Sequence, residues 1–315
     1  MRITLILLAV FIIVISPFFG QIELSLKNIV DATTMDYQIF WDIRLPRTLL
    51  AFCVGAILAL SGLVFQTIFR NPMSTPFTLG VASGATLFTA IGIVLGFTAY
   101  ISLFAFIGAM ITVIILFLIV SRFETVQTSS LLLIGIALSF FYSASLMVLF
   151  FISDLQESYE IVRFTMGSLD IVGFDNIYLI AIAAIFILIL VKRFQYHIKL
   201  LLTSHELAYL KGIDVKRTNY ILLLGISIVV GICVSITGPI GFVGLIVPHI
   251  IKTIMQKSAD QLIYPIFFYG GVFLVFCDLI ARNLGTVSDI PIGVVTSFLG
   301  APFFIYLIIK RKKSL

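Results

Sequence analysis

Few residues of this 315-residue chain have a type and spacing that could do chemistry. His205-Glu206 starts like the zinc-binding HExxH motif, but Tyr209 stands where the second His is required. The sequence also has no Gly-Lys pair, so it lacks the phosphate-binding loop that many ATP-hydrolysing proteins use. We therefore expect a chain that is not an enzyme and has no catalytic, cofactor or metal site. Any ATP and Mg²⁺ that drive its function would be bound by a partner subunit.

The three cysteines give no sign of a metal or redox site either. Cys53, Cys233 and Cys277 lie within apolar runs, far apart in the sequence, and form no Cys/His pattern with metal-ligand spacing. We interpret them as buried packing residues.

Two pairs of ionisable residues fall inside apolar stretches, where a charge at the bilayer centre costs at least about 2.5 kcal/mol. Asp278 and Arg282 are four residues apart, so on a helix they can pair, either as a structural ion pair or as part of a docking site. His249 and Lys252 favour a helix end with an interfacial Lys over a proton relay. No carboxylate lies in the middle third of an apolar stretch, which argues against an ion-coupled carrier.

The elements that must position these residues are long apolar segments. The chain is 61% hydrophobic and 11% charged, against about 25% charged in soluble domains. A bilayer core of about 30 Å needs roughly 20 apolar residues of helix, and ten stretches qualify. They are Ile3 to Phe19, Thr48 to Phe69, Phe77 to Gly96, Thr98 to Val120, Ser129 to Ile152, Ile177 to Val191, Tyr220 to Thr237, Ile240 to Met255, Leu262 to Ile280, and Ile292 to Ile309.

Charge placement supports this count. With both termini in the cytoplasm, fifteen of the twenty Lys and Arg residues fall inside, while eleven of the fifteen acids fall outside. One span more or fewer in the middle would invert every later loop and destroy this asymmetry. We therefore expect an all-α, multi-pass protein of the bacterial inner membrane, and we attribute the net charge of +5 to topology rather than to nucleic-acid binding.

The organisation along the chain indicates one transmembrane domain, residues 1–315. No cleavage site follows the first apolar run, so we interpret it as an uncleaved span. Gly55, Ala59 and Gly62 share one helix face and predict close helix packing. Two connections are long and polar, the outer loop 20–47 and the inner loop 192–217, and such loops usually carry partner contacts.

Three ordered motifs carry a family resemblance. The first runs from Arg44-Leu45-Pro46-Arg47 through Arg70-Asn71-Pro72 to Gly84-Ala85. The second is Gly238-Pro239-Ile240 with Phe242-Val243-Gly244-Leu245 and Pro248-His249. The third is Pro291, Gly293, Thr296, Gly300, Pro302 and Phe303. Over about 42–310 the chain resembles the FecCD-type permeases of iron-siderophore, haem and cobalamin ABC importers.

The resemblance implies a ten-helix permease of the type II ABC importer architecture that pairs with a second permease, either another copy or a paralogue. Two ATP-binding cassette subunits would dock inside and a substrate-binding protein outside. It implies docking to the binding protein through Arg44, Arg47 and Arg282, because such arginines meet carboxylates on that partner. It implies coupling to the ATPase through Glu206, Ala208 and Gly212 in the loop 192–217. It places Thr128 and Ser129 near a cytoplasmic gate.

The sequence hypothesis is an ATP-driven importer subunit for a metal chelate, with a ferric siderophore as first choice and haem or cobalamin as alternatives. Two other classes remain open. An ion-coupled secondary carrier would need an essential intramembrane acid, and an intramembrane enzyme would need paired catalytic groups at one depth.

Overall fold

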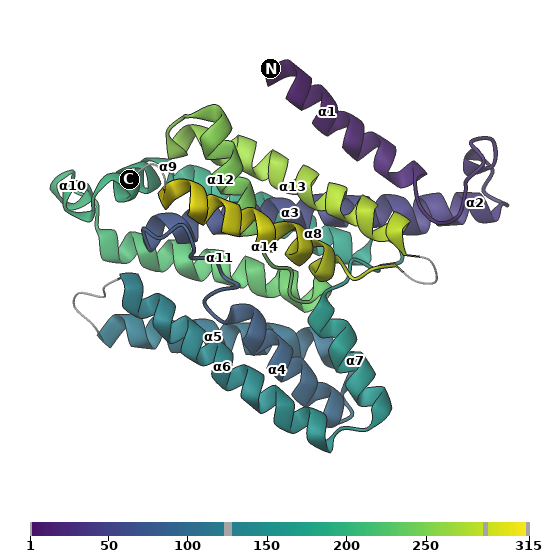
Figure 1. Ribbon diagram of the computed structural model, residues 1–315, viewed down its shortest axis with the longest axis horizontal. Helices are drawn as coiled ribbons and strands as arrows, with labels where there is room; N and C mark the ends of the chain where they lie inside the picture. The colour runs from purple at the N-terminus through teal and green to yellow at the C-terminus, as the bar shows by residue number, and fades with distance from the viewer. Residues whose placement is uncertain (1, 123–127, 286–288, 313–315) are drawn as a thin grey trace.

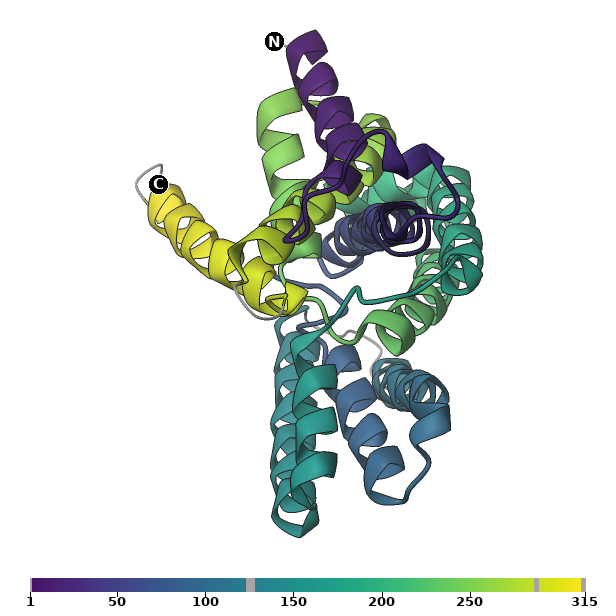
Figure 2. The same ribbon diagram turned by 90° about the vertical axis from the view of Figure 1, so that its right-hand side faces the viewer.

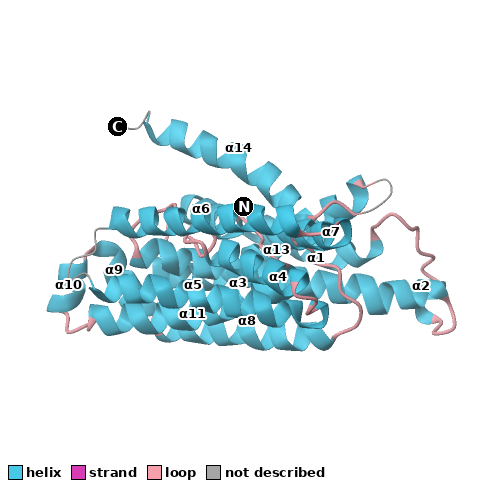
Figure 3. Cartoon of the chain, turned by 90° about the horizontal axis from the view of Figure 1, so that it is seen from below, coloured by secondary structure: helices cyan, strands magenta, loops and turns pink. Residues whose placement is uncertain are grey.

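The computed structural model describes residues 2–122, 128–285 and 289–312, and every regular element in them is a helix. Figure 3 shows this helix-only architecture. Each of the ten predicted segments contains one helix, which confirms the all-α, multi-pass prediction. The ten are α1 (Arg2–Ile15), α3 (Leu45–Ile68), α4 (Val81–Val94), α5 (Ile101–Arg122), α6 (Thr128–Ile152), α8 (Asp175–Arg193), α11 (Val215–Thr237), α12 (Val243–Met255), α13 (Ala259–Leu284) and α14 (Ile292–Lys312).

Six of these segments are long and apolar enough to cross a membrane alone, and the helices α1, α4, α12 and α14 form four shorter apolar segments. The long helices run roughly along the long axis of the molecule (Figure 1). The short helices α2 (Met35–Gln38) and α10 (His205–Leu210) lie at opposite ends of that axis. We call the α2 end outer and the α10 end inner, after the orientation that the charges predict.

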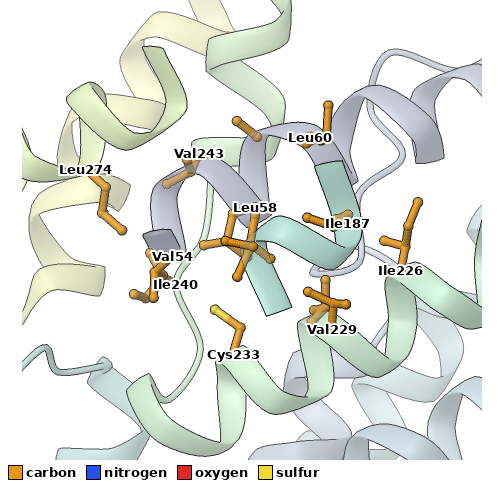
Figure 4. Close-up of a cluster of buried hydrophobic side chains, with 14 of the residues drawn as sticks. Val54, Leu58, Leu60, Ile187, Ile226, Val229, Cys233, Ile240, Val243 and Leu274 are labelled. Atoms are coloured by element: carbon orange, nitrogen blue, oxygen red, sulfur yellow. The ribbon is translucent and has the colours of Figure 1, made fainter. Parts of the chain in front are cut away.

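Helix α3 is the centre of the bundle. It packs against α8, α11, α12 and α13, and almost every side chain from Leu50 to Ile68 is buried. Figure 4 shows its Val54 and Leu58 among apolar side chains of the surrounding helices, including Cys233 of α11. Cys233 and Cys277 are buried and Cys53 is half-buried, in agreement with their predicted packing role.

A second group of helices lies beside this bundle. Helix α4 packs against α5, α6 and α7 (Leu155–Met166), and α5 joins the group to α11. Figure 2 shows the group below the helices that surround α3. Helix α7 was not predicted from the sequence. It begins with a capping box, in which Asp154 accepts from the Glu157 amide and Glu157 accepts from the Asp154 amide.

Glycines allow the closest helix contacts. A side chain at Gly62 would collide with the backbone of Gly244 on α12, and one at Gly55 would collide with the carbonyl of Gly270 on α13. The predicted small-residue face of α3 is thus where two neighbouring backbones meet it.

Helices α4 and α12 are shorter than predicted. The structure has no regular helix at residues 71–80 or 238–242, and Gly80 and Gly238 there have φ of +84° and +65°. The 13 residues of α12 rise only about 20 Å, so non-helical chain completes the span. Backbone groups at that depth need partners from the protein. Within α12, the Gly244 carbonyl also needs a partner, because Pro248 four residues later has no N–H, and Gln66 Nε2 donates to this carbonyl at 3.0 Å.

Candidate functional site

The outer end holds a group of charged side chains that the fold collects from distant segments. Arg47 comes from the first turn of α3, and Asp278 and Arg282 come from the last turns of α13. Asp170 follows α7 and Asp289 precedes α14. We call these five residues together with Arg44 the outer cluster.

Arg47 is the hub of the outer cluster. Its Nε donates to Asp278 at 2.8 Å, while its Nη1 donates to Asp170 at 2.7 Å and to Asp289 at 2.5 Å. Asp278 also pairs with Arg282, whose Nε lies 3.0 Å away, which confirms the ion pair predicted from the four-residue spacing. Three arginines thus face three aspartates, so the cluster is close to neutral.

The other two arginines tie the chain after α1 to the bundle. Arg44 donates to the carbonyls of Phe18 at 3.2 Å and Ile22 at 2.5 Å. Arg282 Nη2 donates to Ser16 Oγ at 2.6 Å. All three arginines therefore have partners within this chain.

Burial corrects one part of the docking expectation. Arg44, Arg47 and Arg282 are only 5%, 6% and 4% exposed, although the sequence placed them as solvent-facing charges. Asp278, which is fully buried, pairs with Arg47 and Arg282, and at the rim Arg47 also pairs with Asp170 and Asp289, whose side chains are 45% and 31% exposed. The role of the three arginines in docking stays a prediction. No pattern in the sequence indicates Asp170 as a partner of Arg47.

At the inner end, the predicted coupling residues lie on and after α10. Ser204 caps the helix by accepting from the Leu207 amide. Gly212, with φ of +79°, ends it in a Schellman motif, because its amide donates to Tyr209 and the Ile213 amide donates to Ala208.

The three predicted coupling residues have different surroundings. Ala208 is fully buried against Leu201 and Ile213, while Glu206 is exposed. A side chain at Gly212 would meet open space. Ala208 and Gly212 therefore hold α10 in place, and Glu206 is available to a partner.

Three apolar residues of α10, Leu207, Tyr209 and Leu210, are also exposed, and sequence reasoning did not single them out. Tyr209 and Leu210 are 75% and 81% exposed, and together with Glu206 and Val215 they line a shallow concavity. Neighbouring exposed apolar side chains in a polar loop are a signal that could have identified this face.

A cavity of about 520 Å³ lies between α4, α6, α7 and α14. Its lining carries hydroxyl groups and apolar surface but no charged side chain. Tyr142, one of the lining residues, bonds through its hydroxyl to Thr112 at 3.1 Å. The lining residues are Phe77, Ala82, Ser83, Thr86, Tyr142, Ser143, Leu146, Thr165, Met166, Pro239, Gly241, Gly293, Val294, Ser297 and Phe298.

The remaining predictions concern the inner half of the membrane. Thr128 and Ser129 open α6, and their side chains lie outside those that the structure describes, so the gate stays a prediction. Lys252 is half-buried, with its ammonium 3.5 Å from Gln66 Oε1. In the described part of the chain, no group of three His, Cys, Asp or Glu residues could hold a metal ion.

Known proteins resemble the chain over nearly its whole length. The model of the FecCD transport family matches residues 7–310. The hemin transport system permease protein HmuU of Yersinia pestis is 35% identical, over 98% of this chain and 95% of that protein. The vitamin B12 import system permease protein BtuC of Vibrio vulnificus is 32% identical, over 98% and 94%. A solved structure, described as a metal-chelate type ABC transporter in an inward-facing conformation, has a TM-score of 0.87 at 31% identity and covers 98% of both chains.

Proposed function

Because the chain belongs to the FecCD transport family, and is thus a permease of ABC importers for metal-chelate, haem or cobalamin-type substrates, we propose that it imports a ferric siderophore. ATP hydrolysis on separate subunits would drive the transport. Haem and cobalamin are the alternative substrates, since relatives named for hemin and vitamin B12 transport are about equally similar.

The uncharged cavity is the observation that carries the proposal. A bare metal ion would need carboxylate, imidazole or thiolate ligands, and the lining residues offer hydroxyls and apolar surface. A metal ion enclosed in an organic ligand needs no such ligands from the protein. Selectivity would then reside in the external binding protein, and the cavity would pass a bulky chelate through weak contacts.

The proposed assembly places a partner at each end and a second permease at the side. The substrate-binding protein would dock at the outer end, the ATP-binding subunits with their ATP and Mg²⁺ at α10, and the second permease against the open side of the cavity. Phe298 lines the cavity and is 79% exposed. So large an exposed apolar side chain beside the transport path favours a contact with the second permease.

Docking through the outer cluster requires a change in this structure. A carboxylate of the binding protein can reach Arg47 only by displacing Asp170 or Asp289. Reversing the charge of Arg47 would place four acids together, so the docking test belongs at Arg44, which donates to backbone carbonyls. We expect Arg44→Gln to weaken docking of the loaded binding protein without affecting ATPase assembly, and equal docking would refute its role.

Uptake measurements test the transport function. Vesicles with the permease, the ATP-binding subunits and the binding protein should accumulate ferric siderophore only with ATP. Parallel uptake assays with haem and with cobalamin show which of the three substrates is transported. Transport that survives omission of the ATPase would favour a secondary carrier and refute the proposal.

The orientation has its own test. A reporter fused within the loop 192–217 should be active on the cytoplasmic side, and so should one fused after the C-terminus. A signal from the loop on the outer side would invert the scheme and remove α10 as the ATPase site.

A further inference from the structure

We propose that Arg47 is a clasp that holds the outer end of the cavity closed. It ties the segment after α7, through Asp170, to the segment before α14, through Asp289. The proposal rests on the proposed transport function and deepens it, because it assigns a positioning role in the transport path to a residue expected only to dock a partner.

The clasp lies next to the residues that form one wall of the cavity. Asp170 is four residues beyond Met166, and Asp289 is four residues before Gly293. Met166, Gly293 and Pro239 all line the cavity, and we call them the outer wall. They touch one another through backbone, since a side chain at Gly293 would collide with the Met166 carbonyl and also meet the Pro239 carbonyl. Separating the two segments would therefore open this wall.

The guanidinium of Arg47 has one fixed partner and two partners that can move. Its Nε is held by Asp278, which is fully buried in α13 and also paired with Arg282. Its Nη1 holds both Asp170 and Asp289, which come from non-helical segments and are partly exposed. Water or a competing carboxylate can therefore replace Asp170 and Asp289 as partners of Arg47 at small cost. Neither can reach the buried Asp278 to replace it.

Additional contacts hold the same two segments. Gln21 Nε2 donates to Asp289 at 3.3 Å and to the Gly285 carbonyl at 3.0 Å. The Ser168 amide donates to the Thr237 carbonyl at 2.8 Å. These contacts keep the segments in register, and the ion pairs with Arg47 are the strongest bonds that join one segment to the other.

The test is the accessibility of the cavity from outside. Ser297 is an exposed residue of the cavity lining, and Ser297→Cys would place a thiol there. Labelling by a membrane-impermeant maleimide is measured in sealed, right-side-out vesicles. The parent protein without this cysteine gives the blank for Cys53, Cys233 and Cys277.

We expect Asp170→Asn with Asp289→Asn to speed the labelling roughly tenfold, since two charge-assisted bonds that favour the closed wall are weakened. Arg47→Lys, which keeps the charge but loses the two-nitrogen fork, should give an intermediate rate. Asp175→Asn removes an exposed acid of the outer side that does not belong to the outer cluster, and it should leave the rate unchanged.

Equal labelling in the parent cysteine variant and the Asp170→Asn, Asp289→Asn variant would overturn the clasp. So would fast labelling before any clasp residue is changed. Both substitutions are nearly isosteric, and an unchanged elution profile in detergent checks that the variant is folded. Labelling needs no substrate, ATP or binding protein. If the uptake tests fail but labelling increases in the Asp170→Asn, Asp289→Asn variant, the proposed function is rejected and the clasp stands. If uptake succeeds but labelling is unchanged, the clasp is rejected and the proposed function stands.

Discussion

The two ends of the molecule present opposite surfaces. At the outer end, six charged side chains form a cluster in which all three arginines are buried against acids or carbonyls of the same chain. At the inner end, α10 exposes Tyr209 and Leu210 on a helix that is capped at both ends. The outer end is therefore stabilised by ion pairs that can exchange partners, and the inner end by local backbone geometry that keeps its shape.

This difference separates two ways of transmitting a signal. Exchange of partners in the outer cluster changes which segments are tied together, as proposed for Arg47. A rigid helix such as α10 instead moves as a unit when its partner moves. Substitutions at the two ends should accordingly have different consequences, and the following predictions are ordered from the largest effect to the smallest.

Arg47→Ala should have the largest effect on stability. It leaves Asp278 buried without its partner on α3, which costs about 3–5 kcal/mol of unfolding free energy. Thermal unfolding in detergent measures the loss. Arg163→Ala is the control, because Arg163 is 63% exposed and 3.8 Å from Asp170, so it should cost about 0.5 kcal/mol or less. Similar losses for both would show that the outer cluster is not a stabilising network.

Tyr209→Ala with Leu210→Ala should weaken binding of the ATP-binding subunit by about 2 kcal/mol or more, as expected for large apolar side chains at the centre of an interface. The measurement is a titration of the purified ATPase against the permease in nanodiscs. Tyr178→Ala, a 65% exposed aromatic residue on the side of α8, is the matched control. Unchanged binding of the α10 variant would remove this face from the interface.

Gly212→Ala should uncouple ATP hydrolysis from transport, and more strongly when combined with Glu206→Ala. A side chain at φ of +79° costs roughly 1–2 kcal/mol and loosens the end of α10. Gly173→Ala imposes the same strain at φ of +75° on the outer side, again in open space. The ratio of ATP hydrolysed to substrate transported should rise only in the Gly212 variants, and an equal rise in both would mean that backbone strain alone is being measured.

Removing an N-cap should give the smallest effect, about 1 kcal/mol of local stability. Asp154→Ala affects the start of α7 and Ser204→Ala the start of α10. Hydrogen exchange should increase only in the first turn of the helix whose cap is removed. An increase that extends from α7 into the outer wall would show that α7 is not an independent unit.

The sequence could predict the elements that depend on local pattern. The ten spans follow from apolar length, and the Asp278–Arg282 pair follows from four-residue spacing on one helix. The capping box of Asp154 and Glu157 is also a local pattern, and it marks the start of α7. The late starts of α4 and α12 follow from residues with positive φ directly before them, Gly80 and Phe242, and the sequence does not show these φ values.

The outer cluster could not be predicted, because its contacts join distant parts of the chain. Asp170, Asp278 and Asp289 lie 123, 231 and 242 residues beyond Arg47. A single sequence contains no periodicity at such separations. The sequence therefore predicts that the three arginines share one end of the molecule, but it assigns them to solvent, because it does not show their internal partners.

The hydrogen bond from Gln66 to the Gly244 carbonyl has a consequence for engineering. A hydropathy profile would favour Leu at position 66, because Gln66 is one of the few polar residues in an apolar helix. Such a replacement would leave the carbonyl at the irregular start of α12 without this donor, inside a membrane where water cannot take its place. Sequence optimisation toward a more lipid-like α3 would thus produce a protein that inserts more readily and folds less well.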